Sequence, residues 1–273
     1  MVRALWTAAS GMIAQQTNVD NIANNLANVN TTGYKTSTAE FKSLLYQTIQ
    51  TKTTSANGDN KPIGAQVGLG TRTSSITTQF TQGSMLASEN NFAFGIEGDG
   101  FFALRGADGE TYYTRSGDFR IAIASDNTMM LASTDGYPVL DSNGTPIILS
   151  STDYKADKIT VTDDGQLFYP DADNNLKPMN ITIGVYQFSN PAGLEKVSGT
   201  MYQATTASGA AVEELNDKSL KASKLHQGYL EGSNVQVVDE MVNLITAQRA
   251  YEMNSKAIQA ADDMLSQANQ LKR

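Results

Sequence analysis

The run of residues most suggestive of chemistry is Gly98-Asp99-Gly100-Phe101-Phe102-Ala103, which matches the dinucleotide-binding pattern G-x-G-x-x-A. Asp118 follows about twenty residues later, where a ribose-binding acid would stand. That chemistry requires a helix to begin at the glycines, so that its N-terminus faces the pyrophosphate. Gly106 and Asp108-Gly109 end the segment before a helix could form. We therefore interpret these glycines as hairpin turns and predict no cofactor.

A second candidate is a calcium loop, because Asp171, Asp173 and Asn175 have the spacing with which such loops begin. Leu176 stands where the loop requires Gly, and Thr182 stands where it requires Glu. The pattern thus fails at both positions, and we expect a solvated turn and no metal site.

The side chains for nucleophilic catalysis are scarce. His226 is the one histidine and there is no cysteine, which excludes a Cys–His dyad, disulfides and Cys-ligated zinc. Adjacent acids occur at Asp163-Asp164, Glu213-Glu214 and Asp262-Asp263, where solvated charge is the simplest interpretation. A wall hydrolase that uses Asp163 and Asp164 stays open as an alternative, because sequence does not show which acids share a cleft. We predict that the chain is not an enzyme.

The overall charge limits the partners. A net charge of −8 and a pI near 4.7 argue against nucleic acid, because phosphate binding requires clustered Lys and Arg. The apolar stretch Ala4–Ala14 is interrupted by Gly11, so it makes a poor signal-peptide core. If the protein leaves the cytoplasm, we expect it to do so without a cleaved signal.

The N-terminal segment predicts an amphipathic helix with a seven-residue period. The repeating apolar residues, with others three positions after members of the series, are Leu5, Met12, Val19, Ile22, Leu26 and Val29. Turn residues follow at 28–33, and Gly33 is suited to the left-handed conformation that ends a helix. The predicted helical segment is 1–33.

The C-terminal segment, 234–273, repeats the pattern with Val237, Met241, Leu244, Tyr251, Ile258 and Leu265. Ser233 and Gln236 predict a capping box and a helix that begins at Asn234. At 1.5 Å per residue this helix runs roughly 55 Å, so it needs a partner of similar length. We predict that the two terminal helices form a coiled-coil-like assembly layer. Packing of both helices on one globular core is the simpler alternative.

The middle of the chain predicts antiparallel strands. Asp-Gly and Asn-Gly pairs recur between short β-prone runs, and such pairs are strong hairpin signals. We place a central β-rich domain at 66–233 and an extended connector at 34–65. The predicted fold class is α+β, with long N- and C-terminal helices around this central antiparallel domain.

Four segments resemble the bacterial flagellar rod and hook subunits. The first is Ile22–Lys35 (IANNLANVNTTGYK), followed by EGDGFF at 97–102 with YTRSG at 113–117, GYLEGSNV at 228–235 and QRAYEMNSK at 248–256. Positions that match the N-terminal signature of the family are Asn24, Asn25, Leu26, Ala27, Asn28, Thr31, Gly33, Tyr34 and Lys35. The resemblance covers essentially the whole chain. The run PIGAQVGLGTR at 62–72 and the chain length favour the distal-rod branch, and the closely related other rod subunit stays open.

The resemblance implies a structural subunit of the flagellar basal-body rod, exported through the flagellar channel. It implies helical assembly with copies of itself, beside adjoining rod and hook subunits, into the shaft that joins motor to hook. No small-molecule substrate is implied. The rival interpretation from the residues alone is a β-rich adhesin or carbohydrate-binding protein with incidental helices. That interpretation leaves the seven-residue apolar period of both terminal segments, the predicted assembly seam, unexplained.

Overall fold

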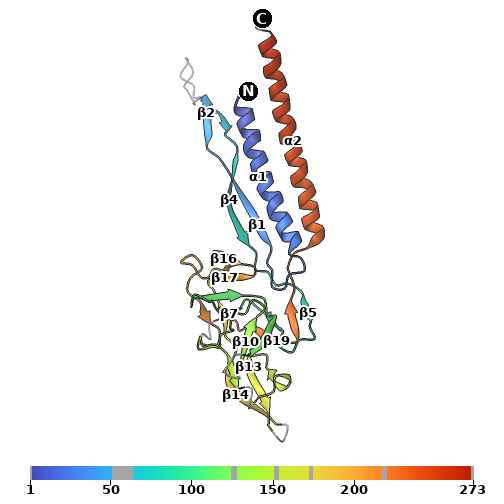
Figure 1. Ribbon diagram of the computed structural model, residues 1–273. Coiled ribbons are helices and arrows are strands. Elements are labelled where there is room, and N and C mark those ends of the chain that lie inside the picture. The colour runs from blue at the N-terminus through green and yellow to red at the C-terminus, as the bar shows by residue number, and fades with distance from the viewer. Residues whose placement is uncertain are drawn as a thin grey trace. The chain divides into compact units, whose positions relative to one another are not determined.

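A helix lies at each end of the chain and antiparallel strands lie between them, which confirms the α+β class (Figure 1). The structure is a computed structural model that describes residues 2–50, 64–123, 128–150, 154–171, 175–216 and 220–271. The chain divides into two units. Unit 1 contains Met1–Ala27, Ser37–Thr78 and Gln236–Arg273, and unit 2 contains Asn28–Thr36 and Gln79–Val235.

Unit 1 holds the helices α1 (Val2–Ala27) and α2 (Val237–Gln270) side by side in antiparallel directions (Figure 1). Asp239 and Glu240 in the first turn of α2 favour its start, because carboxylates interact well with the positive end of the helix dipole. The predicted capping box is wrong. Gln236 is the N-cap and makes no side-chain cap bond, while Ser233 Oγ accepts from Val235 N at 3.2 Å in a local turn.

Unit 1 also holds four strands, in a region where the sequence predicts an extended connector and the start of the central domain. They are β1 (Ser37–Ser43), β2 (Tyr46–Gln50), β3 (Ala65–Gly68) and β4 (Thr71–Thr78). β1 pairs with β4 and β2 pairs with β3, both antiparallel, so the four form a long two-stranded ribbon. The expected extended connector at 34–65 therefore carries strands in its described part, and residues 51–63 of it lie outside the described residues.

Unit 2 is built from antiparallel pairs, in agreement with the predicted central β region. Its largest sheet has six strands in the order β16-β17-β8-β7-β15-β18. The strands of unit 2 are β5 (Met85–Ala87), β6 (Phe94–Glu97), β7 (Phe101–Arg105), β8 (Thr111–Thr114), β9 (Phe119–Ile123), β10 (Thr128–Ser133), β11 (Ile148–Ser150), β12 (Thr160–Val161), β13 (Gln166–Pro170), β14 (Leu176–Thr182), β15 (Val185–Gln187), β16 (Glu195–Ser198), β17 (Met201–Gln203), β18 (Val212–Glu213), β19 (Lys224–Gln227) and β20 (Tyr229–Glu231).

The predicted turns explain how these short strands are connected. Gly109 lies between β7 and β8 with φ 84°, and Gly165 lies between β12 and β13 with φ 79°, as Asp-Gly hairpins require. β7 begins at Phe101, directly after Gly100, so no helix starts at the glycines of the dinucleotide pattern. The glycines connect β6 to β7, but these two strands lie in different sheets and do not pair with each other, so the interpretation of the glycines as hairpin turns is wrong.

Two apolar clusters form the core of unit 2. The larger includes Phe94, Phe102 and Phe119, and the smaller is centred on Phe101 and Tyr202. Within each cluster, aromatic rings pack edge to face. In the larger cluster, for example, the ring centroids of Phe102 and Phe119 are 5.0 Å apart. These clusters hold the sheets together and set the place of the polar side chains described below.

Candidate assembly surface

The contact between α1 and α2 uses small side chains. Ala8 and Ala14 of α1 are buried, as are Ala247 and Ala261 of α2. A Cβ added at Gly11 would lie 2.8 Å from Asn254 Nδ2, so the Asn254 side chain of α2 packs directly against the backbone of α1 at that point. The predicted large apolar residues therefore do not form the centre of the helix pair within one chain.

The seam residues predicted on α1 lie at its margins. Ile22 is buried, whereas Leu5, Met12, Val19 and Leu26 are half-buried. Val29, predicted on the same ladder, lies beyond the end of α1 and belongs to unit 2.

The seam residues predicted on α2 are more open to solvent. Leu244 and Ile258 are half-buried, while Val237, Met241, Tyr251 and Leu265 are exposed. These four side chains are available for contacts with a partner, and α1 does not cover them.

Both helices carry further exposed apolar residues that were not predicted from the sequence. Trp6 is 71% exposed and Ile13, seven positions later on α1, is 66% exposed. Val238, Val242 and Ile245 of α2 are also exposed, at the helical spacing of four and three. The sequence does indicate these residues, because they form a second apolar stripe beside the residues of the predicted seven-residue period. Contiguous exposed apolar residues of this kind mark interaction surfaces.

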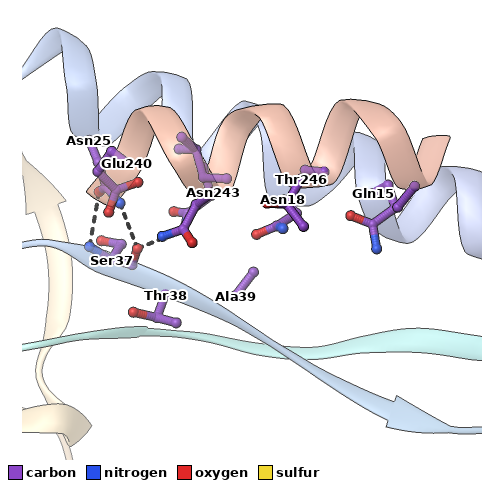
Figure 2. A pocket seen from close by; sticks show the side chains of 13 residues that line it. Gln15, Asn18, Asn25, Ser37, Thr38, Ala39, Glu240, Asn243 and Thr246 are labelled. Carbon is purple, nitrogen blue, oxygen red and sulfur yellow. Dashed lines mark hydrogen bonds between the residues drawn. The ribbon is translucent and has the colours of Figure 1, made fainter. Parts of the chain in front are cut away.

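A polar groove of 380 Å³ lies in unit 1 between the two helices and β1 (Figure 2). Asn25 closes one end of it, because its Nδ2 donates to Ser37 O at 2.8 Å and its Oδ1 accepts from Ser37 N at 3.0 Å. Asn21 Nδ2 also donates to Ser37 O, at 2.6 Å. Side-chain amides of α1 thus bind the backbone of β1 in the way that a neighbouring strand would. These contacts give Asn25, a signature residue, a structural role.

Glu240 lines the same groove and is 9% exposed. Burial raises the pKa of its carboxyl, and a hydrogen bond with Asn25 opposes that change. Its Oε2 is buried and makes no hydrogen bond within the described part of the chain. A buried carboxylate oxygen without a donor is costly, so this atom is well suited to receive a donor from outside.

Unit 2 contains a buried ion cluster in which three of the resemblance segments meet. Lys35 Nζ donates to Glu231 Oε1 at 2.6 Å and to Thr81 O at 2.7 Å. Arg115 Nη1 lies 3.8 Å from Glu231 Oε2, and all three charged side chains are almost completely buried. Gly83 N also donates to Glu231 Oε1, at 2.9 Å. One carboxylate therefore sits between two cations in the core.

Desolvation is the main electrostatic effect on both cations. Burial lowers the pKa of Lys35, and the charge of Glu231 opposes this. Burial also lowers the pKa of Arg115, against the attraction of Glu231 and, after it, of Asp99 and Glu214. The Arg115 guanidinium lies 5.3 Å from the centre of the Phe101 ring, which offers a further favourable contact.

Two other contacts fix the same chain segments to each other. Asn234 Oδ1 accepts from Thr36 N at 2.7 Å, and its Nδ2 donates to Gln79 O at 2.9 Å. Gly33 has the predicted left-handed conformation, with φ 69°, although α1 ends earlier, at Ala27, so Gly33 does not terminate the helix. A Cβ at Gly33 would lie 2.8 Å from the carbonyl carbon of Arg115. The resemblance segments 22–35, 113–117 and 228–235 therefore meet in one buried cluster of unit 2, where their residues have a structural role.

The residues considered for catalysis are not brought together. His226 Nε2 lies 2.7 Å from Glu97 Oε2 on the surface of unit 2, and Asp163 and Asp164 belong to the hairpin turn before β13. In the described ranges no three or more His, Asp or Glu side chains are placed to hold a metal ion. Asp173 of the calcium pattern lies outside the described residues. Neither described helix combines the length and apolar composition that crossing a bilayer requires.

Comparison with known proteins gives matches along most of the chain. Residues 5–35 match the family described as flagella basal body rod protein, 95–169 match the D1 domain of the flagellar hook protein FlgE/F/G, and 226–271 match the C-terminal family of the flagellar basal body rod FlgEFG proteins. The flagellar basal-body rod protein FlgG of Borreliella burgdorferi is 44% identical over 275 residues, covering 100% of both chains. FlgG of Agrobacterium fabrum is 44% identical with 97% of each chain covered, and FlgG of Bacillus subtilis is 35% identical with 100% covered.

Proposed function

Because the chain belongs to the flagellar basal-body rod family, whose members are structural rod subunits and not enzymes, we propose that it is a subunit of the distal rod. In that role, copies assemble helically, next to adjoining rod and hook subunits, into the shaft that transmits motor torque to the hook. The closely related other rod subunit of the same family is the second candidate. Full-length similarity to three FlgG proteins supports the first.

The observation that carries the assembly proposal is the set of large apolar side chains that the helix pair leaves exposed. Small residues hold α1 to α2, while Met241, Ile245 and Trp6 face solvent in the single chain. Burying the exposed part of such side chains would stabilise a contact by about 1–2 kcal/mol each, which favours association between copies of the chain. We propose that the coiled-coil-like layer expected from the sequence forms between these faces of different copies. The apolar residues that the sequence predicts for the seam of each terminal segment belong to that layer.

Assembly through such faces is heterologous, because the surface of α1 differs from that of α2. Contacts of this kind build an open helical filament when the rotation between copies does not close a ring. Many parallel contacts along two long helices would give the shaft its stiffness. Export without a cleaved signal, through the flagellar export apparatus, completes the proposal.

The test is to add charge to the exposed face of α2. Met241→Glu combined with Ile245→Glu should abolish filament formation, because two carboxylates would have to be buried in the contact. The matched control is Gln259→Glu, an exposed position on the same helix, which should leave assembly unchanged. Circular dichroism checks that the variants keep their helices. Filaments that still form from the double variant would refute the proposed seam.

Placement within the rod is tested separately, by labelling this chain in purified hook–basal bodies and locating it by electron microscopy. We expect the label next to the hook. A label at the motor end of the rod would favour the related subunit.

A further inference from the structure

The polar groove of unit 1 has unused hydrogen-bonding groups. Gln15, Asn18 and Asn243 line it, and their side-chain amides make no hydrogen bond to another residue in the described part of the chain. Figure 2 shows these side chains on the helix side of the groove, where they face the strand β1. Glu240 adds a carboxylate oxygen that is buried and lacks a donor. The groove is therefore built to accept something that carries hydrogen-bond donors.

The side chains at this end of α2 carry negative charge that no Lys or Arg of the described residues pairs with. Asp239 is exposed next to Glu240, and neither forms an ion pair within the described residues. A partner that brings positive charge would satisfy both carboxylates. The groove thus favours a cationic partner segment over a neutral one.

A matching cationic feature lies on the ribbon of the same unit. Lys42 of β1 and Arg72 of β4 are directly opposite each other in the antiparallel register. Both are exposed, and the described residues offer neither of them an ion pair. Like charges directly opposite on paired strands repel each other. This pair is thus an unfavourable arrangement in the single chain, and an anionic partner would relieve it.

The two features cannot meet within one chain. Ser37, at the start of β1, is held at the Asn25 end of the groove. Lys42 lies five residues farther along β1, which at 3.3 Å per residue places it roughly 16 Å away. Contact between the cationic pair and Glu240 therefore requires a second copy of the chain, displaced along the helix axis.

We infer that the groove between α1, α2 and β1 is the docking site for the ribbon of a second copy, whose Lys42 and Arg72 lie against Asp239 and Glu240. The amides of the groove bind the polar backbone and side chains around that pair. The contact is heterologous, so each copy offers a ribbon to one neighbour and a groove to another. It rests on the proposed function, since it describes how copies assemble, and it names a polar contact distinct from the apolar faces of the helices.

Charge reversal tests the pairing in the full chain. The ribbon variant carries Lys42→Glu and Arg72→Glu, and the groove variant carries Asp239→Lys and Glu240→Gln, which avoids placing a buried cation in the groove. Each variant alone should raise the critical concentration for assembly at least tenfold, measured by light scattering and electron microscopy. All four substitutions in one chain should restore assembly to within threefold of the original chain, because opposite charges meet again. The matched control reverses two other exposed cations of unit 1, Arg3→Glu and Lys256→Glu, and should change the critical concentration less than twofold.

A crosslink provides a second readout that does not depend on charge. The chain has no cysteine, so Arg72→Cys and Asn243→Cys in one chain introduce the only two thiols. A short bis-maleimide should link copies into a ladder of oligomers once assembly has occurred, while thiols placed at 72 and 256 should give no ladder.

The outcomes separate the inference from the proposed function. An original chain that never assembles would overturn both. An original chain that assembles, with ribbon and groove variants that assemble equally well, would overturn the docking inference alone. Loss of assembly in the control variant, Arg3→Glu with Lys256→Glu, would also overturn the docking inference. So would a combined variant that does not recover assembly, if the crosslinker also gives no ladder of oligomers.

Discussion

Replacing Lys35 with methionine should destabilise unit 2 less than replacing its partner Glu231 with glutamine. Both substitutions remove the same ion pair, whose Nζ–Oε1 distance is 2.6 Å. They differ in the charge that remains, because Arg115 lies 3.8 Å from the other oxygen of Glu231. The Lys35→Met variant keeps one buried cation and one buried anion. The Glu231→Gln variant keeps two buried cations and no anion between them.

The magnitudes follow from that count. Leaving a buried charge without its partner costs about 3–5 kcal/mol, so Glu231→Gln should lie at the upper end of that range. Its amide oxygen can still accept from Gly83 N, which limits the loss. The Lys35→Met change removes charge-assisted bonds to Glu231 and Thr81, a loss of about 1.5–3 kcal/mol. The methionine side chain fills much of the space that the lysine stem occupied.

Guanidinium unfolding measures the difference, with the two units followed by separate signals. Trp6 is the only tryptophan and lies on α1, so its fluorescence reports on unit 1. Tyr113 and Tyr202 are buried in unit 2, so near-ultraviolet circular dichroism of tyrosine reports on that unit. Both substitutions should shift the tyrosine transition, while the tryptophan transition serves as the internal control.

A single result would refute the reasoning. If Lys35→Met costs as much as Glu231→Gln or more, then the charge balance of the buried cluster does not govern its stability. Combining Lys35→Met with Glu231→Gln gives a further check, because removal of both partners should cost less than the sum of the two single changes.

Three further predictions concern packing and hydrogen bonding. Tyr202→Phe should stabilise unit 2 by about 1 kcal/mol in denaturant unfolding, because the buried hydroxyl has no hydrogen-bond partner among the described residues; a loss of stability would show that the hydroxyl is bonded. Gly33→Ala should cost about 3 kcal/mol or more, because φ is 69° and the added Cβ meets backbone atoms; a thermal midpoint within 2 °C of the original would contradict this. Asn25→Leu should destabilise unit 1 by about 2–3 kcal/mol through loss of both bonds to Ser37, whereas Gln16→Leu, at an exposed position of the same helix, is the control and should cost less than half as much.

The helices and the hairpin turns were predictable because their signals are local. A seven-residue apolar period marks both helices, and Asp-Gly pairs such as Asp108-Gly109 mark turns within a few residues of the strands they join. The family signatures were also visible, although their physical role was not.

The ribbon of unit 1 was missed because the half-buried face of β4 carries Thr and Ser in place of apolar residues, and β1 is largely exposed. β1 and β4 carry Ser, Thr and charged residues and lack the apolar alternation of a half-buried strand. Their pairing joins residues that lie from 28 positions apart, at Ser43 and Thr71, to 41 positions apart, at Ser37 and Thr78, and a local pattern does not report such contacts. The sequence reading therefore assigned part of this region to an extended connector.

The buried ion cluster was missed for a related reason. Lys35, Arg115 and Glu231 each look like an ordinary solvated charge, and as many as 196 residues separate the partners of one hydrogen bond. The small-residue contact between the helices was overlooked because the ladder of large apolar residues was the stronger signal. In the structure, the small residues hold the pair together and several of the large ones stay exposed.

Quenching of Trp6 fluorescence by acrylamide tests the central claim most directly, since the apolar faces left exposed on the helices should become buried when copies assemble. Trp6 is 71% exposed in the single chain and is the only tryptophan, so excitation that is selective for tryptophan reports on this residue alone. We predict a blue-shifted emission and at least a fivefold lower quenching constant in filaments than in the monomer. Filaments in which Trp6 is quenched as readily as in the monomer would contradict burial of this face on assembly.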